Sequence, residues 1–358
     1  MKNKLIFFLL PFVFFLLSGC VKINTSPSGK ASNLGGVFKT TNKGDSWVNV
    51  SLIANTSGKP VDFSSTNGSY LAIDPSDANA VYFGAVENGL FYSFDGGTSW
   101  QIAKALGKGT VRSIAVDPKD KCTIYVSRGN KVFKSIDCNR TWDQVYQDTD
   151  INVMIDSLLV DGTDNKIVYF STSRGDFVRS GDAGASWHTA ERFNDRIIKF
   201  VLNQKKSKEV YAATKQKGVF KTNDGGDNWE RIIELDKALK DNKINYNAKD
   251  LLLFNGENKK IIYVVVQGGL MKSVDDGETW EMIELIPPQS NVLINAFEIN
   301  PKNELEMYYV TNTTFYRSND GGTNWTTLPL PTSRAGWMLA IDPGDTNVMY
   351  LGVTQVSK

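Results

Sequence analysis

Short apolar runs alternate with polar turns along nearly the whole chain. A typical unit is Leu71-Ala-Ile-Asp-Pro-Ser-Asp-Ala-Asn-Ala-Val-Tyr-Phe-Gly84, in which an Asp-Pro turn separates two apolar runs. Similar units recur at 114–127 and 339–352, with weaker copies at 158–171, 200–213, 252–266 and 297–311. Apolar runs of roughly four to eight residues bounded by turn residues are typical of strands. Each unit therefore predicts a pair of strands, and the second strand is centred on a tyrosine: Tyr82, Tyr125, Tyr169, Tyr211, Tyr263, Tyr308 or Tyr350.

A third apolar run follows each pair and ends in an octet of the form Ser/Thr-X-Asp-X-Gly-X-X-Trp. The seven octets end at Trp47, Trp100, Trp142, Trp187, Trp229, Trp280 and Trp325, at intervals of 42 to 53 residues. In such a turn the Asp accepts backbone N–H bonds, the Gly supplies a positive φ, and the Trp folds back as an apolar plug. The octet therefore predicts a turn between a third and a fourth strand. Four short antiparallel strands per unit are typical of a β-propeller blade.

The two ends of the chain decide how many blades to expect. The repeats begin with a third and fourth strand around Gly36-Val-Phe-Lys-Thr40 and finish with a first and second strand over 338–353. Neither half buries its faces alone, so we expect the two halves to form one composite blade that closes the ring. The predicted fold is an all-β, seven-bladed β-propeller of four-stranded antiparallel blades.

The octet resembles the Asp box, or BNR repeat, of secreted β-propellers, and the resemblance extends over essentially the whole mature chain. In families that carry the box its Asp is structural. The resemblance therefore implies structural roles for Asp95, Asp137, Asp182, Asp224, Asp275 and Asp320. Two boxes depart from the pattern, since Asn42 replaces the Asp of the first and Asn139 replaces the Gly of the third.

The first twenty residues predict an address outside the cytoplasm. Lys2 and Lys4 precede an apolar run over 5–17, which is shorter than the roughly 20 residues that a membrane-spanning helix needs. The run ends in Leu17-Ser18-Gly19-Cys20, which resembles the bacterial lipobox. The resemblance implies a signal peptide over 1–19 and lipidation of Cys20. Residues 21–34 are rich in Ser, Asn, Gly and Lys, so we expect a lipidated tether over 20–34 before the propeller of 35–358. We expect a lipid-anchored protein of the bacterial cell envelope that faces the periplasm or the exterior; an ordinary secretory leader is the alternative.

Composition removes several classes of function. The chain has 40 Lys and Arg against 39 Asp and Glu, and removal of Lys2 and Lys4 with the leader leaves 38 against 39. Without a basic surplus, nucleic acid is not an expected partner. His188 is the only histidine, so zinc clusters and Ser-His-Asp triads lack their ligands and bases. We expect no metal and no cofactor.

Cys122 and Cys138 are the two cysteines that remain after the leader. They replace Asn79 and Gly96 of the preceding repeat, and these positions belong to two turns at the same end of one blade. An oxidising compartment favours disulfides. We therefore predict a Cys122–Cys138 disulfide; two unrelated small residues are the alternative reading.

Candidate binding residues lie on the rim opposite the Asp boxes. Counting five residues back from the Asp or Asn of each Asp-Pro-type turn gives the start of each innermost strand: Ser69, Arg112, Asp156, Ile198, Asp250, Asn295 and Trp337. Neighbouring loops on the same predicted rim add Arg174, Arg192, Arg196 and Arg334. Most of these side chains form hydrogen bonds, and a Trp stacks on sugars or peptides. A solvated rim without a ligand is the alternative. Long connections at 51–68, 234–249 and 284–295 are further candidates for partner contacts.

Whether the chain is an enzyme turns on its carboxylates. Glycoside hydrolysis uses a pair of carboxyl groups about 5 to 9 Å apart. Asp156 and Asp250 are the only acidic residues of the predicted ring and belong to blades two apart. The Arg-Ile-Pro of sialidases is missing, and Asp-box xyloglucanases, which the chain also resembles, place their catalytic groups between two propellers.

The boxes are similar to those of sortilin-like and xyloglucanase propellers, and the length and anchor resemble those of the photosystem II assembly factor family. We therefore expect a non-catalytic scaffold that binds a protein or glycan partner. A glycoside hydrolase or carbohydrate-binding propeller is the alternative.

Overall fold

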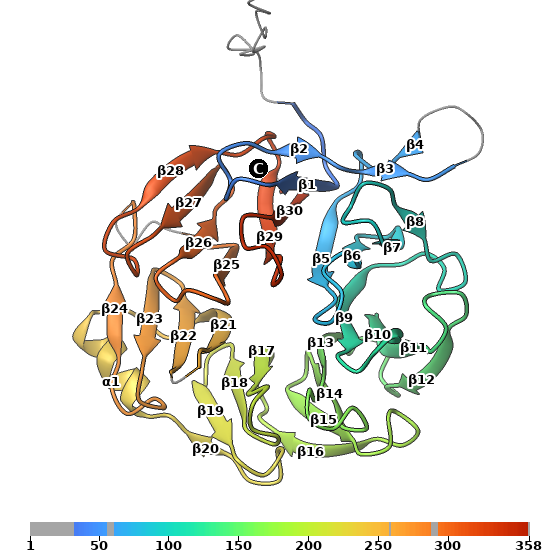
Figure 1. Ribbon diagram of the computed structural model, residues 1–358. Coiled ribbons are helices and arrows are strands. Elements are labelled where there is room, and N and C mark those ends of the chain that lie inside the picture. Colours follow the sequence, from blue (N-terminus) through green and yellow to red (C-terminus); the bar gives the residue numbers. More distant parts are fainter. Residues whose placement is uncertain (1–31, 56–60, 258, 288–292, 357–358) are drawn as a thin grey trace, which may run out of the picture. The chain divides into compact units, whose positions relative to one another are not determined.

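Seven four-stranded antiparallel sheets stand around a common axis in the computed structural model (Figure 1). The structure describes residues 32–55, 61–257, 259–287 and 293–356. The predicted signal peptide, Cys20 and the tether up to residue 31 lie outside the described residues. Within the described part, the seven-bladed β-propeller predicted from the repeats is confirmed.

Each blade runs from an inner strand beside the axis to an outer strand at the circumference (Figure 1). The composite blade consists of β29 (Ala335–Ile341), β30 (Met349–Thr354), β1 (Val37–Thr40) and β2 (Val48–Asn49). The next three blades are β5 to β8 (Gly68–Ile73, Val81–Ala85, Gly89–Ser93, Gln101–Ile102), β9 to β12 (Val111–Asp117, Asp120–Arg128, Lys131–Ser135, Asp143–Gln147) and β13 to β16 (Ile155–Val160, Val168–Thr172, Asp176–Ser180, His188–Arg192). The last three are β17 to β20 (Ile197–Leu202, Val210–Thr214, Val219–Thr222, Glu230–Arg231), β21 to β24 (Ala248–Asn255, Lys260–Val266, Gly269–Ser273, Glu281–Ile283) and β25 to β28 (Ala296–Ile299, Met307–Val310, Thr314–Ser318, Thr326–Pro329).

The ring closes through the predicted pairing of the two chain ends. β1 pairs antiparallel with β30, with Val37 opposite Gly352 and Thr40 opposite Met349. Because β30 would otherwise expose a free edge, this pairing supplies its missing backbone partners and removes the open edge. The closure of the toroid thus depends on contacts between residues about 300 positions apart.

The hydrophobic core lies between the blades. Its buried residues form seven clusters, and each cluster joins facing sides of neighbouring sheets, as where Tyr263 of β22 meets Phe297 of β25. The repeat tyrosines of the second strands are almost completely buried. A sheet buried on both faces requires near-continuous apolar strands, which is what β6, β14 and β18 provide.

The Asp boxes are held by a repeated hydrogen-bond pattern. Ser93 Oγ donates to Asp95 Oδ1 over 2.7 Å and accepts from the Gly97 N–H at 2.9 Å, while the Ser99 N–H donates to Asp95 Oδ1 at 2.8 Å. The same contacts recur around Asp137, Asp182, Asp224, Asp275 and Asp320. Asn42 takes the place of the Asp in the first box through its Oδ1. These carboxylates therefore have their hydrogen-bonding capacity directed into the turn.

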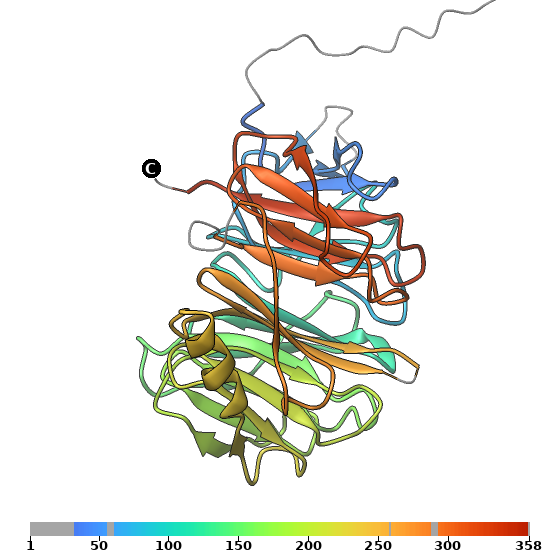
Figure 2. The ribbon, with the colours of Figure 1, turned by 90° about the vertical axis from the view of Figure 1, so that its left-hand side faces the viewer.

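Two of the long connections contain secondary structure that the repeat pattern does not indicate. β3 (Leu52–Ile53) and β4 (Val61–Asp62) form a two-stranded ribbon that projects from the ring (Figure 1). The connection after β20 contains α1 (Glu234–Asp241), which lies on the outer surface of the ring (Figure 2) and buries Leu235 and Leu239. The only helix of the described residues is thus too short and polar to cross a bilayer.

The structure joins Cys122, near the start of β10, to Cys138 in the Asp box that follows β11. Their sequence separation is 16 residues and their Cα atoms lie 4.0 Å apart. A cross-link that closes a loop of this length restricts the unfolded chain and stabilises the fold by about 3 kcal/mol. We expect the double variant Cys122→Ser, Cys138→Ser to lose about that much free energy of unfolding in urea denaturation. Equal stability of both proteins in oxidising buffer would contradict the role of the disulfide.

Candidate binding site at the tunnel mouth

A β-bulge near the start of the inner strand occurs in six of the seven described blades. In each case one residue is skipped in the register between the first and second strands. A bulge leaves its extra residue without a cross-strand partner and re-aims its side chain. The six extra residues are Ser69, Arg112, Asp156, Ile198, Lys249 and Trp337.

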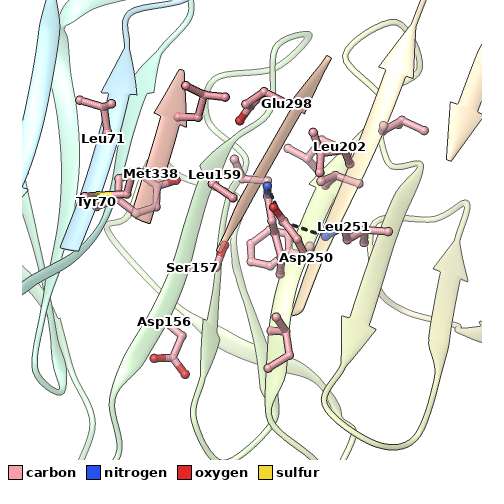
Figure 3. Close-up of a pocket in the computed structure, with 18 of the residues that line it drawn as sticks. Tyr70, Leu71, Asp156, Ser157, Leu159, Leu202, Asp250, Leu251, Glu298 and Met338 are labelled. Atoms are coloured by element: carbon pink, nitrogen blue, oxygen red, sulfur yellow. Dashed lines mark hydrogen bonds and ion pairs between the residues drawn. The ribbon is translucent and has the colours of Figure 1, made fainter. Parts of the chain in front are cut away.

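All six bulge residues line one opening at the end of the axis, which we call the mouth. The mouth is a cavity of about 1000 Å³. A second cavity of about 460 Å³, which we call the tunnel site, shares Tyr70, Asp156, Asp250 and Trp337 with it. Figure 3 shows Asp156, Asp250 and Glu298 following one another along this cavity. The repeated bulges therefore bring side chains from six inner strands of similar position into one recess.

Two arginines from different blades hold Asp156 in the mouth. Arg196 donates from Nε to Oδ2 at 2.8 Å and from Nη2 to Oδ1 at 3.0 Å, and Arg112 Nη1 reaches Oδ1 at 3.4 Å. The Asp156 side chain is only 6% exposed, whereas those of the arginines are 45% and 37% exposed. The bidentate pair is the stronger geometry, so Arg112 keeps most of its donors free. Arg112, Arg196 and Asp156 together carry a net charge of +1 at the mouth.

Three ionisable groups meet deeper in the tunnel site. Lys199 Nζ forms an ion pair with Asp250 Oδ1 at 2.8 Å. Burial would lower the pKa of Lys199, but the Asp250 carboxylate outweighs it and raises that pKa. Burial raises the pKa of Glu298 to about 8, and Lys199 opposes this only in part. The raised pKa of Glu298 favours its protonated form near neutral pH, next to the ion pair of Lys199 and Asp250.

No set of three or more His, Cys, Asp or Glu side chains in the described ranges is placed to hold a metal ion. The mouth and the tunnel site instead combine paired charges with aromatic and aliphatic side chains. Such a surface binds organic ligands or polymer segments through stacking and hydrogen bonds.

Parts of the chain are similar to a family model and to a curated protein. Residues 175–266 match the family model described as Sortilin-Vps10, sortilin and neurotensin receptor 3. Over 160 residues the chain is 29% identical to a xyloglucanase of Hypocrea jecorina (strain QM6a), an alignment that covers 43% of this chain and 19% of the xyloglucanase.

Solved structures resemble the whole ring. The GH74 xyloglucanase from Xanthomonas campestris superimposes with a TM-score of 0.65 at 17% identity, covering 81% of this chain and 51% of that one. YCF48 bound to D1 peptide gives a TM-score of 0.59 at 15% identity, covering 81% of this chain and 95% of that one. The chain thus spans about a fifth of the curated xyloglucanase and about half of the solved one. At these identities the structural likeness shows the fold alone.

The chain is a seven-bladed β-propeller of the Asp-box type. In this Asp-box propeller, most of the predicted rim residues meet as expected: Arg112, Asp156, Arg196, Asp250 and Trp337 line the mouth, and Asn295 lines the tunnel site. The position of Asp250 is corrected by one residue, because the bulge of β21 falls at Lys249. Asp250 is equivalent instead to Lys199 of the neighbouring blade, with which it forms an ion pair.

Arg174 and Arg334 line neither the mouth nor the tunnel site, so the structure places them apart from the other predicted rim residues, and their role in ligand binding stays a prediction. Arg174 Nη2 pairs with Asp148 at 3.0 Å and Nε donates to Asp176 at 2.9 Å, so it links two buried carboxylates. Arg334 is 7% exposed and donates to the carbonyl groups of Asn33 and Ser65, both at 3.1 Å. Both arginines of the Asp-box propeller have structural contacts instead of a free guanidinium.

The sequence did not single out Lys249 of the mouth, or Lys199, Glu298 and Tyr70 of the tunnel site. The signal that finds Lys249 is the extra residue between the bulge and the turn of β21, which shifts the count by one. Glu298 lies two residues along β25 from Ala296, on the same strand face, so the period-two rule points to it once the inner strand is known.

Proposed function

We propose that the protein is a non-catalytic lipoprotein of the bacterial cell envelope whose mouth binds a protein or glycan partner and holds it on a rigid ring. The observation that carries this proposal is the pairing of both ring carboxylates. Asp156 has its two oxygens occupied by Arg196 and Arg112, and Asp250 Oδ1 accepts from Lys199 and from the Leu251 N–H. Carboxylates held in this way position the inner strands instead of attacking a substrate.

The likeness to YCF48 bound to D1 peptide supports a binding role, because it covers nearly all of that protein and uses a single propeller. The mouth also has the free donors that a partner needs. Arg112 makes one long contact, and Lys249 forms no hydrogen bond or ion pair with another described residue. A rigid ring with such donors is suited to docking a partner without turnover.

A crosslinking experiment in membranes tests the binding role. We expect the wild-type protein, expressed with its own leader in its own envelope, to give a discrete crosslinked product that Arg112→Glu weakens at least fivefold. Lys121→Glu is the matched control, because Lys121 is 61% exposed beside the turn at the opposite end of its blade. Equal crosslinking by both variants and the wild type would count against the mouth.

The lipid anchor is tested separately by labelling with radioactive palmitate. We expect incorporation in the wild-type protein and none in Cys20→Ser, with the variant moving from the membrane fraction to the soluble fraction. Membrane association that persists in Cys20→Ser would contradict anchoring through this residue.

A glycoside hydrolase is the second candidate, favoured by Glu298. Its carboxyl group, with a pKa of about 8, is protonated at neutral pH and is of the type that a general acid requires. The 29% identity to a xyloglucanase over part of the chain points the same way. If this candidate holds, Glu298→Gln and Asp250→Asn should each reduce reducing-sugar release from xyloglucan at least a hundredfold. We expect no release by the wild type, and measurable turnover that both variants abolish would replace the binding role with hydrolysis.

A further inference from the structure

The tunnel site has the size of a pocket for a small ligand. Its volume of about 460 Å³ falls within the range of roughly 300 to 1000 Å³ that is usual for such pockets. Its walls come from inner strands of several blades, which the ring closure keeps at fixed separation. A folded partner is therefore excluded from the tunnel site, and the occupant is a small molecule or the end of a polymer.

Polar groups without a protein partner face this cavity. The Glu298 side chain forms no hydrogen bond or ion pair with another described residue, although it lines the cavity. The Tyr70 hydroxyl likewise has no bond to the rest of the described chain, and Asn295 uses only its Nδ2, towards Asn312 Oδ1 and the Gly336 carbonyl group. Protonated Glu298 both donates and accepts, as does the Tyr70 hydroxyl. Together these groups offer mixed donors and acceptors instead of a row of one kind.

Trp337 supplies an aromatic surface at the boundary of the mouth and the tunnel site. It is 40% exposed because the bulge of β29 turns it away from the sheet. This distinguishes it from Trp100, which is completely buried as the plug of an Asp box. The exposed indole ring at the edge of the pocket offers a flat apolar surface, which suits stacking with a flat apolar face of a ligand.

Charge selects the kind of ligand. Lys199 and Asp250 neutralise one another at 2.8 Å, the shared Asp156 is neutralised by Arg196 at 2.8 Å, and the raised pKa of Glu298 favours its neutral form, so no charge in the tunnel site lacks a partner. An ionic group brought into such a cavity would lose its hydration without an opposite charge to replace it. A neutral ligand with several hydroxyl groups and a flat apolar face satisfies both the mixed polar groups and Trp337.

We propose that the tunnel site binds the end of a neutral oligosaccharide, with one sugar ring against Trp337 and hydroxyl groups bonded to Glu298, Asn295 and Tyr70. This rests on the proposed binding function and narrows its partner to a glycan. We expect the site to recognise a chain end because the cavity volume falls from about 1000 Å³ in the mouth to about 460 Å³ in the tunnel site. A polypeptide segment is the other occupant, and the experiment distinguishes the two.

The test is isothermal titration of the full-length protein in detergent with cellopentaose, xylopentaose, mannopentaose, chitopentaose and a xyloglucan heptasaccharide. We expect saturable binding of at least one sugar, weakened about tenfold or more in Trp337→Ala. Phe94→Ala is the matched control, because Phe94 is 45% exposed outside both cavities, and it should leave the affinity unchanged.

Two variants of Glu298 test whether sugar binding needs a neutral polar group at this position. Glu298→Gln keeps a neutral group of the same shape and should change the affinity less than threefold, whereas Glu298→Leu should weaken it at least tenfold. Failure of all five sugars to bind, or equal binding by Trp337→Ala, overturns the proposal. Saturable binding of neutral hexapeptides in place of sugars also overturns it and assigns the tunnel site to polypeptide. The membrane crosslinking experiment with Arg112→Glu does not depend on which ligand enters the tunnel site. It therefore tests the proposed binding role independently of the sugar titrations.

Discussion

Replacement of Arg334 by Met should lower the free energy of unfolding by about 2 to 4 kcal/mol. The guanidinium is nearly buried and donates to the carbonyl groups of Asn33, Ser65 and Thr66 and to Asn67 Oδ1. Hydrogen bonds from a charged donor contribute about 1.5 to 3 kcal/mol each, and the variant also leaves buried acceptors unpaired. Urea denaturation of the full-length protein in detergent measures the loss.

The reason for so large an effect is the place of Arg334 in the closure of the ring. It precedes β29 and holds the chain before β1 against the connection that leads into β5, so it joins three segments on which the composite blade depends. Arg140→Met is the control, since Arg140 is exposed and bonds only within its own Asp box. We expect that control to lie within about 0.5 kcal/mol of the wild type. Similar stability of both variants would show that the buried guanidinium does not secure the closure.

The fold was readable from the sequence because each blade repeats the same local chemistry. The Asp-box octet, the buried tyrosine and the turn that begins with an Asp or Asn after the first strand occur seven times, so an ambiguity in one copy is resolved by the others. The ribbon of β3 and β4 and helix α1 lie in connections that have no counterpart in other blades. Internal comparison gives no information there, and short elements in single loops are decided by tertiary packing.

The sequence predicted the positions of the bulge residues of the candidate site only to within one residue. The count from the turns places Arg112, Asp156 and Trp337 correctly, since the bulge and the turn have the same separation in those blades. In β21 the strand is longer, and the count gives Asp250 where the bulge has Lys249. A period of two makes such an error important, because a shift of one residue exchanges the two faces of a strand.

The arginines show a second limit of the sequence. Arg196 and Arg334 both lie in loops on the mouth side, yet Arg196 reaches Asp156 in the mouth and Arg334 reaches backbone carbonyl groups of other segments. Which acceptor a long flexible side chain reaches depends on segments that are distant in the sequence. The residue type and the predicted position on the rim therefore identify candidate side chains. Only the packed structure shows which of them line the cavity and which contact other segments.

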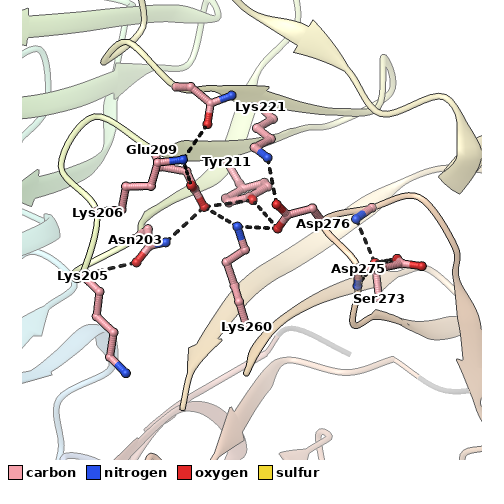
Figure 4. A network of polar contacts seen from close by, with 12 residues as sticks. Asn203, Lys205, Lys206, Glu209, Tyr211, Lys221, Lys260, Ser273, Asp275 and Asp276 are labelled. Atoms are coloured by element: carbon pink, nitrogen blue, oxygen red, sulfur yellow. Dashed lines mark hydrogen bonds and ion pairs between the residues drawn. The ribbon is translucent and has the colours of Figure 1, made fainter. Parts of the chain in front are cut away.

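A buried network between two blades predicts a strong acid dependence of stability. Glu209 is 1% exposed and accepts from Lys260 Nζ at 2.6 Å, Lys206 Nζ at 2.8 Å and the Tyr211 hydroxyl at 3.1 Å (Figure 4). Asn203, which also donates to Glu209 at 3.1 Å, stands where four other blades have an Asp. The carboxylate of this blade is thus supplied by the residue that precedes the second strand, β18, and Lys260 of the next blade forms an ion pair with it.

The pKa of Glu209 gives the direction and the range of the effect. Burial alone would raise that pKa, but the hydrogen bonds from Lys206 and Lys260 outweigh it and lower the pKa from its ordinary 4.5 to about 2. Because the folded-state pKa is below that of the unfolded chain, the stabilisation is present above about pH 4.5 and is lost as the pH falls towards 2. A shift of this size corresponds to about 3 kcal/mol.

Glu209→Gln should therefore be about 3 kcal/mol less stable than the wild type at pH 7, and this difference should shrink steadily between pH 4.5 and pH 2. Urea denaturation at several pH values measures both curves, and the difference between them removes the contributions of the other carboxylates. Glu281→Gln is the matched control, because Glu281 is 66% exposed in its ion pair with Lys272, and such a pair contributes no more than about 1 kcal/mol. Curves of wild type and Glu209→Gln that stay parallel from pH 7 to pH 2 would mean that Glu209 does not carry the acid dependence. In that case the acid sensitivity of the ring would have to come from other carboxylates whose pKa is lowered. Glu306, which forms an ion pair with Lys43 of the closing blade, has the same arrangement.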